Sequence, residues 1–182
     1  MFEVRSTALP GCLELTPAVR KDARGHFIKT VHAGFFDGHA MRSDFREQYY
    51  STSHRNVLRG LHFQLPPQQH AKLVYCTAGK VLDAVLDLRP GDGYGRHVLV
   101  EISAQTANMI YIPAGCAHGF LTLSESATLV YNVTSVYSAS HDSGIRWDSA
   151  GIDWPVSNPI VSERDAGLVA LKDFASPFAR EN

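Results

Sequence analysis

The stretch of this chain that decides its fold is Val57-Leu58-Arg59-Gly60-Leu61-His62-Phe63-Gln64. Its residues alternate with the period of a β-strand, so we expect Arg59 and Leu61 on one face, and His62 and Gln64 side by side on the other. Gly60 leaves room for a ligand or another backbone to approach, and a histidine beside such an opening is a candidate for proton transfer. A lone histidine in a strand is more often a hydrogen-bonded core residue. The role of His62 therefore depends on the residues around it.

Short strand-like segments follow this stretch at near-regular spacing, with turns rich in glycine, proline and aspartate between them. Before the central stretch a strand is predicted over 49–53, and after it strands are predicted over 72–77, 80–88, 97–102, 109–112, 120–123 and 128–137. Many short strands joined by such turns are typical of an all-β sandwich or barrel. Long helical segments do not alternate with them, as they would around a parallel α/β sheet.

The two ends of the chain differ from this central region. Residues 1–20 contain short apolar stretches broken by proline, which predicts an edge strand or an N-terminal arm. The segment 33–47 has a mixed, partly helical pattern. Apolar residues recur at helical spacing between 165 and 174, which predicts a short helix packed on the barrel, within a C-terminal helical tail of about 163–182. We expect one domain over 1–182.

The composition predicts a globular protein of the cytoplasm. Of the 182 residues 45% are hydrophobic, and the net charge of −1 comes from scattered Lys, Arg, Asp and Glu, which favours neither nucleic acid nor a membrane surface as a partner. The sequence contains no apolar run near the roughly 20 residues of a membrane span, and its first residues do not follow a signal-peptide pattern. Cys12, Cys76 and Cys116 are far apart, so buried thiols are expected rather than disulfides or a zinc site.

A second glycine-rich stretch is Pro113-Ala114-Gly115-Cys116-Ala117-His118-Gly119-Phe120. Pro-x-Gly-x-x-His resembles a turn of cupin jelly rolls that delivers a side chain into the mouth of the barrel. Many cupins bind a metal through His-x-His, a glutamate and this later histidine. Here glutamines stand at positions 64, 68 and 69, so only His62 and His118, with His70 nearby, remain as good ligands. Amides bind zinc and iron poorly, so the sequence predicts no metal and no other cofactor.

Four further stretches extend the pattern: Pro66-Pro67, Ala71-Lys72-Leu73-Val74, Leu129-Val130-Tyr131 and Ser162-Glu163-Arg164-Asp165. With them the chain closely resembles the dTDP-4-dehydrorhamnose 3,5-epimerase family over roughly residues 20–177. The resemblance implies a double-stranded β-helix, the cupin jelly roll, and a homodimer. It also implies metal-independent epimerisation of a nucleotide-linked 4-keto-6-deoxy sugar, in the biosynthesis of deoxysugars such as those of surface polysaccharides.

The chemistry of epimerisation explains why such residues are needed. A carbon beside a ketone loses its proton to a base, regains one from an acid on the opposite face, and needs a positive group at the enolate oxygen. The resemblance implies that His62 is the base and Tyr131 the acid. It implies that Asp165 orients His62, and that Lys72 lies near the 4-keto oxygen.

The resemblance also implies a set of substrate contacts. Arg59 and, from a neighbouring subunit, Arg24 match diphosphate contacts, for which a bidentate guanidinium is well suited, and His118 matches a histidine close to the sugar. The other substrate-binding positions predicted are Phe27, Lys29, Glu47, Tyr49, Gln64 and Tyr137. The family usually carries glutamate, glutamine and asparagine at positions 29, 47 and 49. Since these positions surround the base and diphosphate, the departures leave the nucleotide open between dTDP, GDP and CDP.

Two other classes of function stay open at this stage. One is a metal-dependent cupin oxygenase or isomerase, which metal content and sensitivity to a chelator would distinguish. The other is a non-catalytic sugar-nucleotide-binding module, which predicts that His62→Asn leaves function intact. Within the epimerase prediction, the sequence does not decide whether carbon 3, carbon 5 or both are inverted.

Overall fold

The computed structural model describes residues 1–179, so the end of the predicted C-terminal tail lies outside the described residues. The strands are β1 (Phe2–Ser6), β2 (Leu13–Pro17), β3 (Val19–Asp22), β4 (Gly25–Ile28), β5 (Glu47–His54), β6 (Leu58–Gln64), β7 (Lys72–Ala78), β8 (Lys80–Asp87), β9 (His97–Ser103), β10 (Met109–Ile112), β11 (Cys116–Thr122), β12 (Ser126–Val133) and β13 (Asp142–Gly144). The helices are α1 (Ala33–Asp37), α2 (Glu163–Ala166) and the 3-10 helix η1 (Leu171–Asp173).

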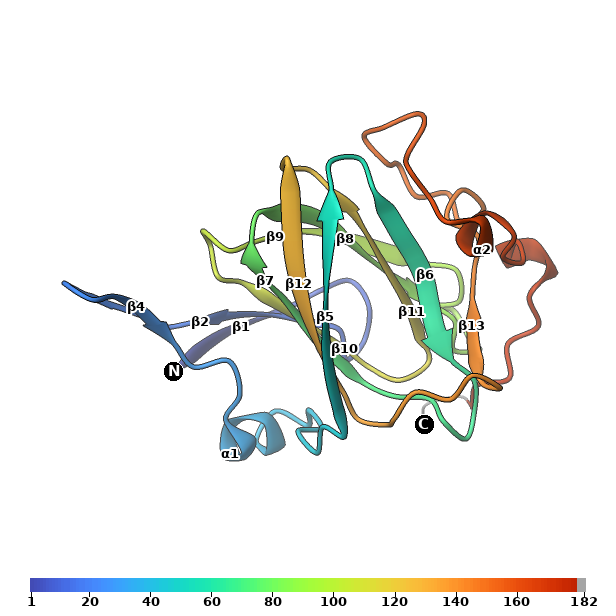
Figure 1. Cartoon of the computed structure of the whole chain (residues 1–182). Coiled ribbons are helices and arrows are strands. Elements are labelled where there is room, and N and C mark those ends of the chain that lie inside the picture. Colours follow the sequence, from blue (N-terminus) through green and yellow to red (C-terminus); the bar gives the residue numbers. More distant parts are fainter. Residues whose placement is uncertain (180–182) are drawn as a thin grey trace.

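Two antiparallel sheets face each other and form the body of the molecule (Figure 1). One sheet has the order β1-β2-β10-β7-β12-β5, and the other has the order β13-β6-β11-β8-β9. Apart from β1–β2 and β8–β9, the neighbouring strands within these two sheets are not consecutive in the sequence, as in a jelly roll. Each strand predicted after the central stretch overlaps a strand of the structure, and the all-β fold class is confirmed.

Apolar residues fill the space between the sheets and also cover both outer faces. The cluster between the sheets contains Val74 and Leu129 from the six-stranded sheet and Val85 and Phe120 from the five-stranded sheet. Burial of each such side chain contributes about 1.5–3 kcal/mol. Separate clusters line the outer faces, which explains why strands such as β8 are buried on both sides. The three cysteines are buried, as the sequence predicts.

The C-terminal segment covers the outer face of the five-stranded sheet, where Phe174 joins the core cluster. The predicted short helix is present as α2 and η1, but the helical turn pattern predicted to run through to residue 174 is wrong. Gly167 ends α2, and Val169 then forms a β-bridge with Ile145. Pairing with the sheet therefore overrides the helical spacing of the apolar residues.

The N-terminal part of the chain divides between the body and a projecting hairpin. β1 and β2 extend the six-stranded sheet, whereas β3 and β4 pair only with each other and reach away from the body in Figure 1. All residues of β3 are exposed. Strands thus occupy the predicted arm, and the helical pattern after it becomes the single short helix α1. The single-domain organisation stays a prediction.

A β-bulge in the central strand changes the predicted alternation. β6 pairs with β11 so that His62 lies opposite His118, whereas Arg59 lies opposite Phe120. Three steps along β6 therefore match two along β11, and the side chains of Arg59 and His62 line the same cavity. The prediction that these two residues face opposite sides is wrong, because alternation assumes an unbroken ladder. Gly60 lies in the bulge with a φ of 132°, and a Cβ there would lie 2.5 Å from the backbone of β11.

Candidate active site

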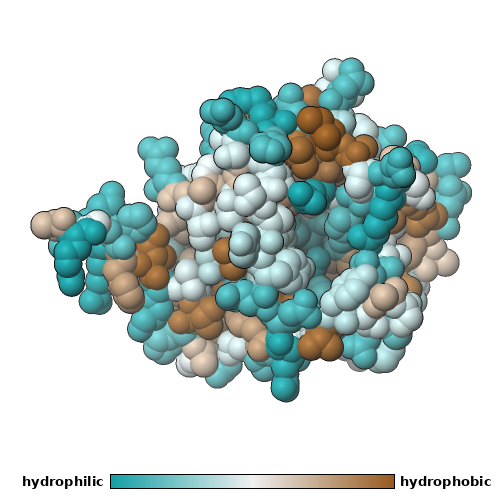
Figure 2. Space-filling model, viewed as in Figure 1, coloured by the Kyte–Doolittle hydropathy of each residue, from teal (hydrophilic) through white to brown (hydrophobic). Residues whose placement is uncertain are grey.

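Two cavities share a wall at the end of the barrel where β5, β6, β7 and β12 meet. The larger chamber has a volume of about 300 Å³, and the predicted residues that line it are Glu47, Tyr49, His62, Gln64, Lys72 and Tyr137. The smaller chamber has a volume of about 200 Å³, and the predicted residues that line it are Tyr49, Arg59, His62, Lys72, His118 and Tyr131. Figure 2 shows this face of the molecule hollowed, with hydrophilic residues around the hollow. The structure thus brings together ten of the thirteen predicted site positions when Asp165, which contacts His62, is included.

His62 forms a dyad with Asp165. Its Nε2 lies 2.7 Å from Oδ1 of Asp165, and Oδ2 of the same carboxylate accepts the backbone N–H of Gly60 at 3.1 Å. Burial raises the pKa of Asp165, but the hydrogen bonds from His62 and Gly60 outweigh it, so the pKa lies below its ordinary value. The charged carboxylate therefore accepts a hydrogen bond from the N–H at Nε2, and this tautomer leaves Nδ1 with the free lone pair.

The position of Asp165 follows from the local sequence. Ser162 caps α2, and its hydroxyl accepts the backbone N–H of Asp165 at 3.0 Å. The cap fixes the first turn of the helix over β6, so the carboxylate points at the strand that carries His62. Only 3% of Asp165 is exposed.

A buried charge cluster lies behind the smaller chamber. His118 Nε2 lies 2.7 Å from Oδ2 of Asp83, and neither side chain is more than 3% exposed. Lys72 donates from Nζ to the carbonyl of His62 at 3.1 Å and is 5% exposed. Burial lowers the pKa of Lys72 to about 8, although Asp83 and Asp142 act in the opposite direction. The wall of the smaller chamber therefore holds Lys72 and His118, with Asp83 behind His118.

Tyr131 presents its phenol to the smaller chamber. The hydroxyl lies 3.1 Å from the hydroxyl of Ser51, and the ring lies between Tyr49 and His118, stacked on the first at 4.8 Å and edge-on to the second at 5.9 Å. Burial raises the pKa of Tyr131 well above its ordinary value, so the phenol keeps its proton.

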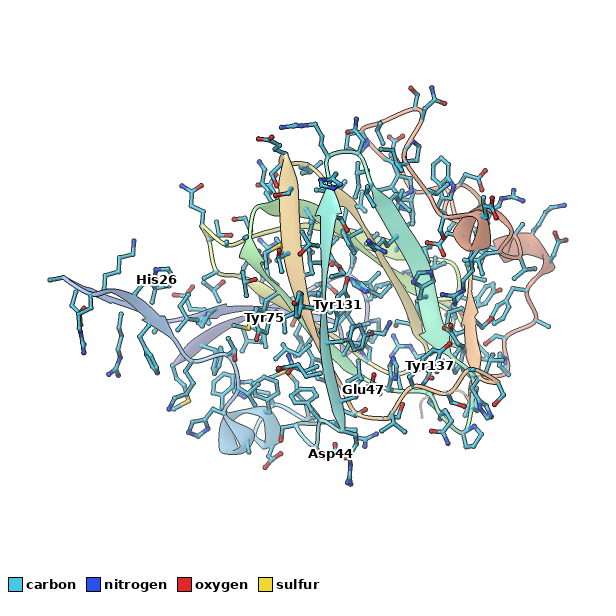
Figure 3. All side chains as sticks on the ribbon, viewed as in Figure 1. His26, Asp44, Glu47, Tyr75, Tyr131 and Tyr137 are labelled. Carbon is cyan, nitrogen blue, oxygen red and sulfur yellow. The ribbon has the colours of Figure 1, made fainter. Side chains whose placement is uncertain are left out.

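The larger chamber has a polar rim. Tyr137 donates its backbone N–H to Glu47 at 2.7 Å, and Figure 3 shows these two residues together at one end of the site with Tyr131 above them. Across the opening, Asp142 accepts from Arg164 at 2.7 Å and from the hydroxyl of Tyr137 at 3.4 Å. These groups offer donors and acceptors to a polar ligand.

Gln64 lines the larger chamber, but its amide is bonded to the protein. Oε1 accepts the backbone N–H of Ser138 at 2.6 Å, and Nε2 donates to the carbonyls of Gln68 and Val136. Gln64 therefore holds in place the loop that carries Tyr137.

Three predicted positions lie elsewhere, in or next to the projecting β3–β4 hairpin. Arg24 and Phe27 line a hollow of the β3–β4 hairpin, and Lys29 lies beside Phe27 at its base. Arg24 is paired with Asp22 at 2.6 Å and 88% of its side chain is exposed, as is 61% of Phe27. In Figure 3 His26 marks how far this hairpin reaches from Tyr131. Within one chain the β3–β4 hairpin does not contribute to the two chambers.

Sequence reasoning missed Asp83, Ser51, Asp142 and Arg164 as site residues. Asp83 gave a signal, because a carboxylate in the middle of an apolar strand needs a buried partner. Arg164 stands in the stretch Ser162–Asp165 that carries the resemblance, but no role was predicted for it. Ser51 and Asp142 gave no signal, since they become neighbours of the site only through the fold. In residues 1–179 no group of three or more His, Cys, Asp or Glu residues could hold a metal ion. None of the helices in that range is long and apolar enough to cross a membrane.

Comparison with known proteins identifies the family. The sequence profile of dTDP-4-dehydrorhamnose 3,5-epimerase matches residues 6–173. The chain is 40% identical to the dTDP-4-dehydrorhamnose 3,5-epimerase of Salmonella typhimurium, over 94% of this chain and 96% of the relative.

Solved structures agree with the sequence comparison. The dTDP-6-deoxy-D-glucose-3,5-epimerase of Legionella pneumophila, in complex with dTDP-4-keto-L-rhamnose, superposes with a TM-score of 0.93 at 29% identity and covers all of both chains. A 4-keto-6-deoxy sugar epimerase from the novobiocin gene cluster of Streptomyces spheroides gives a TM-score of 0.90 at 32% identity, over 95% of this chain and 89% of the other. The chain therefore belongs to the dTDP-4-dehydrorhamnose 3,5-epimerase family, and it is an isomerase with the cupin jelly-roll fold.

Proposed function

We propose that the chain epimerises a dTDP-linked 4-keto-6-deoxy sugar at carbon 3, at carbon 5 or at both. The observation that carries the proposal is the origin of the two proton-transfer groups. His62 comes from β6 in one sheet and Tyr131 from β12 in the other, and both side chains line the smaller chamber. A sugar ring between the sheets meets a base on one face and an acid on the other, as inversion of a carbon centre requires.

In the first step His62 removes the proton beside the ketone. Asp165 keeps the ring proton on Nε2, so Nδ1 takes the proton from carbon. The C–H bond breaks, its electron pair forms the carbon–carbon double bond of an enolate, and the ketone oxygen takes the negative charge. The Asp165 carboxylate then stabilises the imidazolium that results.

Lys72 is the group that meets the enolate oxygen. Its ammonium is buried between the two chambers, where the low local dielectric makes its attraction for a new negative charge stronger than in water. Its hydrogen bond to the carbonyl of His62 ties the cation to the strand that carries the base.

In the second step Tyr131 returns a proton to the opposite face. The enolate collapses to the ketone, its electron pair forms the new C–H bond, and Tyr131 becomes a phenolate. Water then returns a proton to the phenolate and takes the proton from the His62 imidazolium, which restores both groups. His118 is held by Asp83 and lines the same chamber, so it is suited to bond a sugar hydroxyl. Arg59 donates to Ser53 at 2.9 Å and faces this chamber, and we assign it to the diphosphate.

The assignment of dTDP as the nucleotide is based on the relatives, since the sugar nucleotide bound in the Legionella pneumophila structure is dTDP-linked. Lys29, Glu47 and Tyr49 are the positions where this chain differs from the family pattern, and GDP or CDP is the alternative they support. A cytoplasmic location stays a prediction.

We propose that the active unit is a homodimer in which Arg24 and Phe27 of each β3–β4 hairpin complete the partner's site. The exposed hairpin supports this, because its arginine and phenylalanine have no role within their own chain beyond the Asp22 pair. The test is to mix two inactive variants, Arg24→Ala and His62→Asn. A shared site predicts recovery of activity after subunit exchange, since one mixed site then has both wild-type residues. No recovery in verified mixed dimers would contradict it.

The reaction itself is tested by proton NMR of dTDP-4-keto-6-deoxyglucose with the protein and a chelator. Inversion at carbon 3 is expected to change the coupling between the protons on carbons 2 and 3, and inversion at carbon 5 to shift the signals of its proton and of the methyl group. The carbon affected distinguishes single from double epimerisation. An unchanged spectrum with the dTDP-linked sugar, together with turnover of the GDP- or CDP-linked sugar, would overturn the assignment of dTDP as the nucleotide. An unchanged spectrum with all three would overturn the reaction.

A further inference from the structure

Tyr49 has a place in the site that the two proton-transfer groups do not explain. It lies directly opposite Tyr131 in the β5–β12 ladder, and the rings stack with centroids 4.8 Å apart and an angle of 18° between their planes. Tyr49 is also one of three residues that line both chambers, with His62 and Lys72. Tyr131 lines only the smaller chamber. Tyr49 therefore forms the partition between the tyrosine and the larger chamber.

The ring of Tyr131 has few other supports on that side. Ser51 holds its hydroxyl and His118 meets its ring edge-on, and among the aromatic rings of residues 1–179 Tyr49 is the one that stacks on a face of Tyr131. Tyr131 is 7% exposed whereas Tyr49 is 42% exposed, so the outer tyrosine shields the inner one. β5 is the edge strand of its sheet, so no further strand of that sheet lies beyond Tyr49.

We propose that Tyr49 is a positioning residue that holds Tyr131 in place for the second proton transfer and so sets the fraction of enolates that are inverted. The inference rests on the proposed function. An enolate has two ways back to the ketone. Protonation by His62 restores the original configuration, and protonation by Tyr131 gives the epimer. A Tyr131 ring held over the carbon favours the second.

The chemistry of Tyr131 makes its placement matter. Burial raises its pKa, so it gives up a proton only when the receiving carbon lies within reach. Removal of the Tyr49 ring would let Tyr131 turn toward the larger chamber and let water reach it. Deprotonation by His62 would not change, since His62 comes from β6 of the opposite sheet and its partner Asp165 from α2.

The test compares two quantities at the same carbon in heavy water: deuterium incorporation and inversion. Deuterium incorporation counts deprotonation because the proton held by His62, whose side chain is 29% exposed, exchanges with the solvent before it returns to carbon. Tyr49→Ala is expected to lower the ratio of inversion to exchange about tenfold, a change equal to roughly 1.4 kcal/mol between the two return paths. Tyr49→Phe is expected to keep the wild-type ratio, because the stacked ring is retained. The matched control is Tyr50→Ala, since Tyr50 is the next residue, points to the other face and is 72% exposed.

Two results would overturn the inference. One is a Tyr49→Ala ratio equal to that of the wild type. The other is a proportional fall of exchange and inversion, which would make Tyr49 a substrate-binding residue only. Circular dichroism checks that each variant is folded. If the wild type itself shows no exchange, the proposed function fails. That outcome differs from a wild type that epimerises while the Tyr49→Ala variant keeps the same ratio of inversion to exchange, which would refute only the role of Tyr49.

Discussion

Asp165→Asn is the change that tests the dyad most sharply. Asparagine has nearly the same shape, but one carboxylate oxygen becomes an NH₂ donor. The backbone N–H of Gly60 needs the remaining oxygen as its acceptor, so the NH₂ group faces Nε2 of His62. Nε2 must then accept, the ring proton moves to Nδ1, and the base loses the lone pair that takes the substrate proton.

The size of the effect follows from the contacts. A buried hydrogen bond to a charged group contributes about 1.5–3 kcal/mol, and a well-placed general base contributes about 10²–10⁴ in rate. We expect the rate of deuterium exchange to fall about 10²–10⁴-fold, which equals roughly 2.7–5.4 kcal/mol in the barrier. The assay is NMR exchange in heavy water at saturating sugar nucleotide.

Ser162→Ala is the control for the Asp165 variant. It removes the α2 cap at a cost of about 1 kcal/mol in stability and loosens the turn that aims Asp165 at β6, but it keeps the carboxylate as the acceptor for Nε2 of His62, so exchange should fall much less than in Asp165→Asn. A fall of less than about tenfold in folded Asp165→Asn would refute the tautomer argument.

Three further predictions concern other parts of the structure. Because the pKa of Lys72 is lowered to about 8, its ammonium is lost as pH rises through that value, and kcat/KM should fall tenfold per pH unit above it. A flat pH profile to pH 10 would contradict the role of Lys72 at the enolate oxygen. Gly60→Ala should destabilise the fold by more than about 2 kcal/mol in urea unfolding. Gly25→Ala, at a similar φ of 122° but with open space around it, should destabilise the fold less, and equal losses of stability would show that the contact of Gly60 with β11 does not matter. Gln64→Leu should raise KM more than it lowers kcat, because it releases the loop that carries Tyr137, and an unchanged KM would argue against that anchor.

The sequence predicts the strands well because each has both faces buried or a clear turn at its end. It fails at Arg59, since the bulge that turns this residue toward His62 depends on the pairing of β6 with β11. It also fails in the C-terminal segment, where the bridge between Val169 and Ile145 interrupts a helical pattern. Both errors have the same cause: a neighbouring strand decides the local geometry.

The site residues could be named from short motifs, but their arrangement could not. Nothing in the sequence places His62 and Tyr131 on facing sheets, or stacks Tyr49 on Tyr131. Asp83 could have been found as a carboxylate inside an apolar strand. Arg24 shows the opposite limit, since its proposed contact needs a second copy of the chain.

The most direct test of the account is deuterium incorporation into dTDP-4-keto-6-deoxyglucose in heavy water, with chelator, by the wild type and by His62→Asn. The account predicts exchange at carbon 3 or carbon 5 with the wild type, and a loss of at least about 10²-fold with the variant, which removes the general base. Exchange at the wild-type rate in His62→Asn would contradict it, because another group would then be removing the proton.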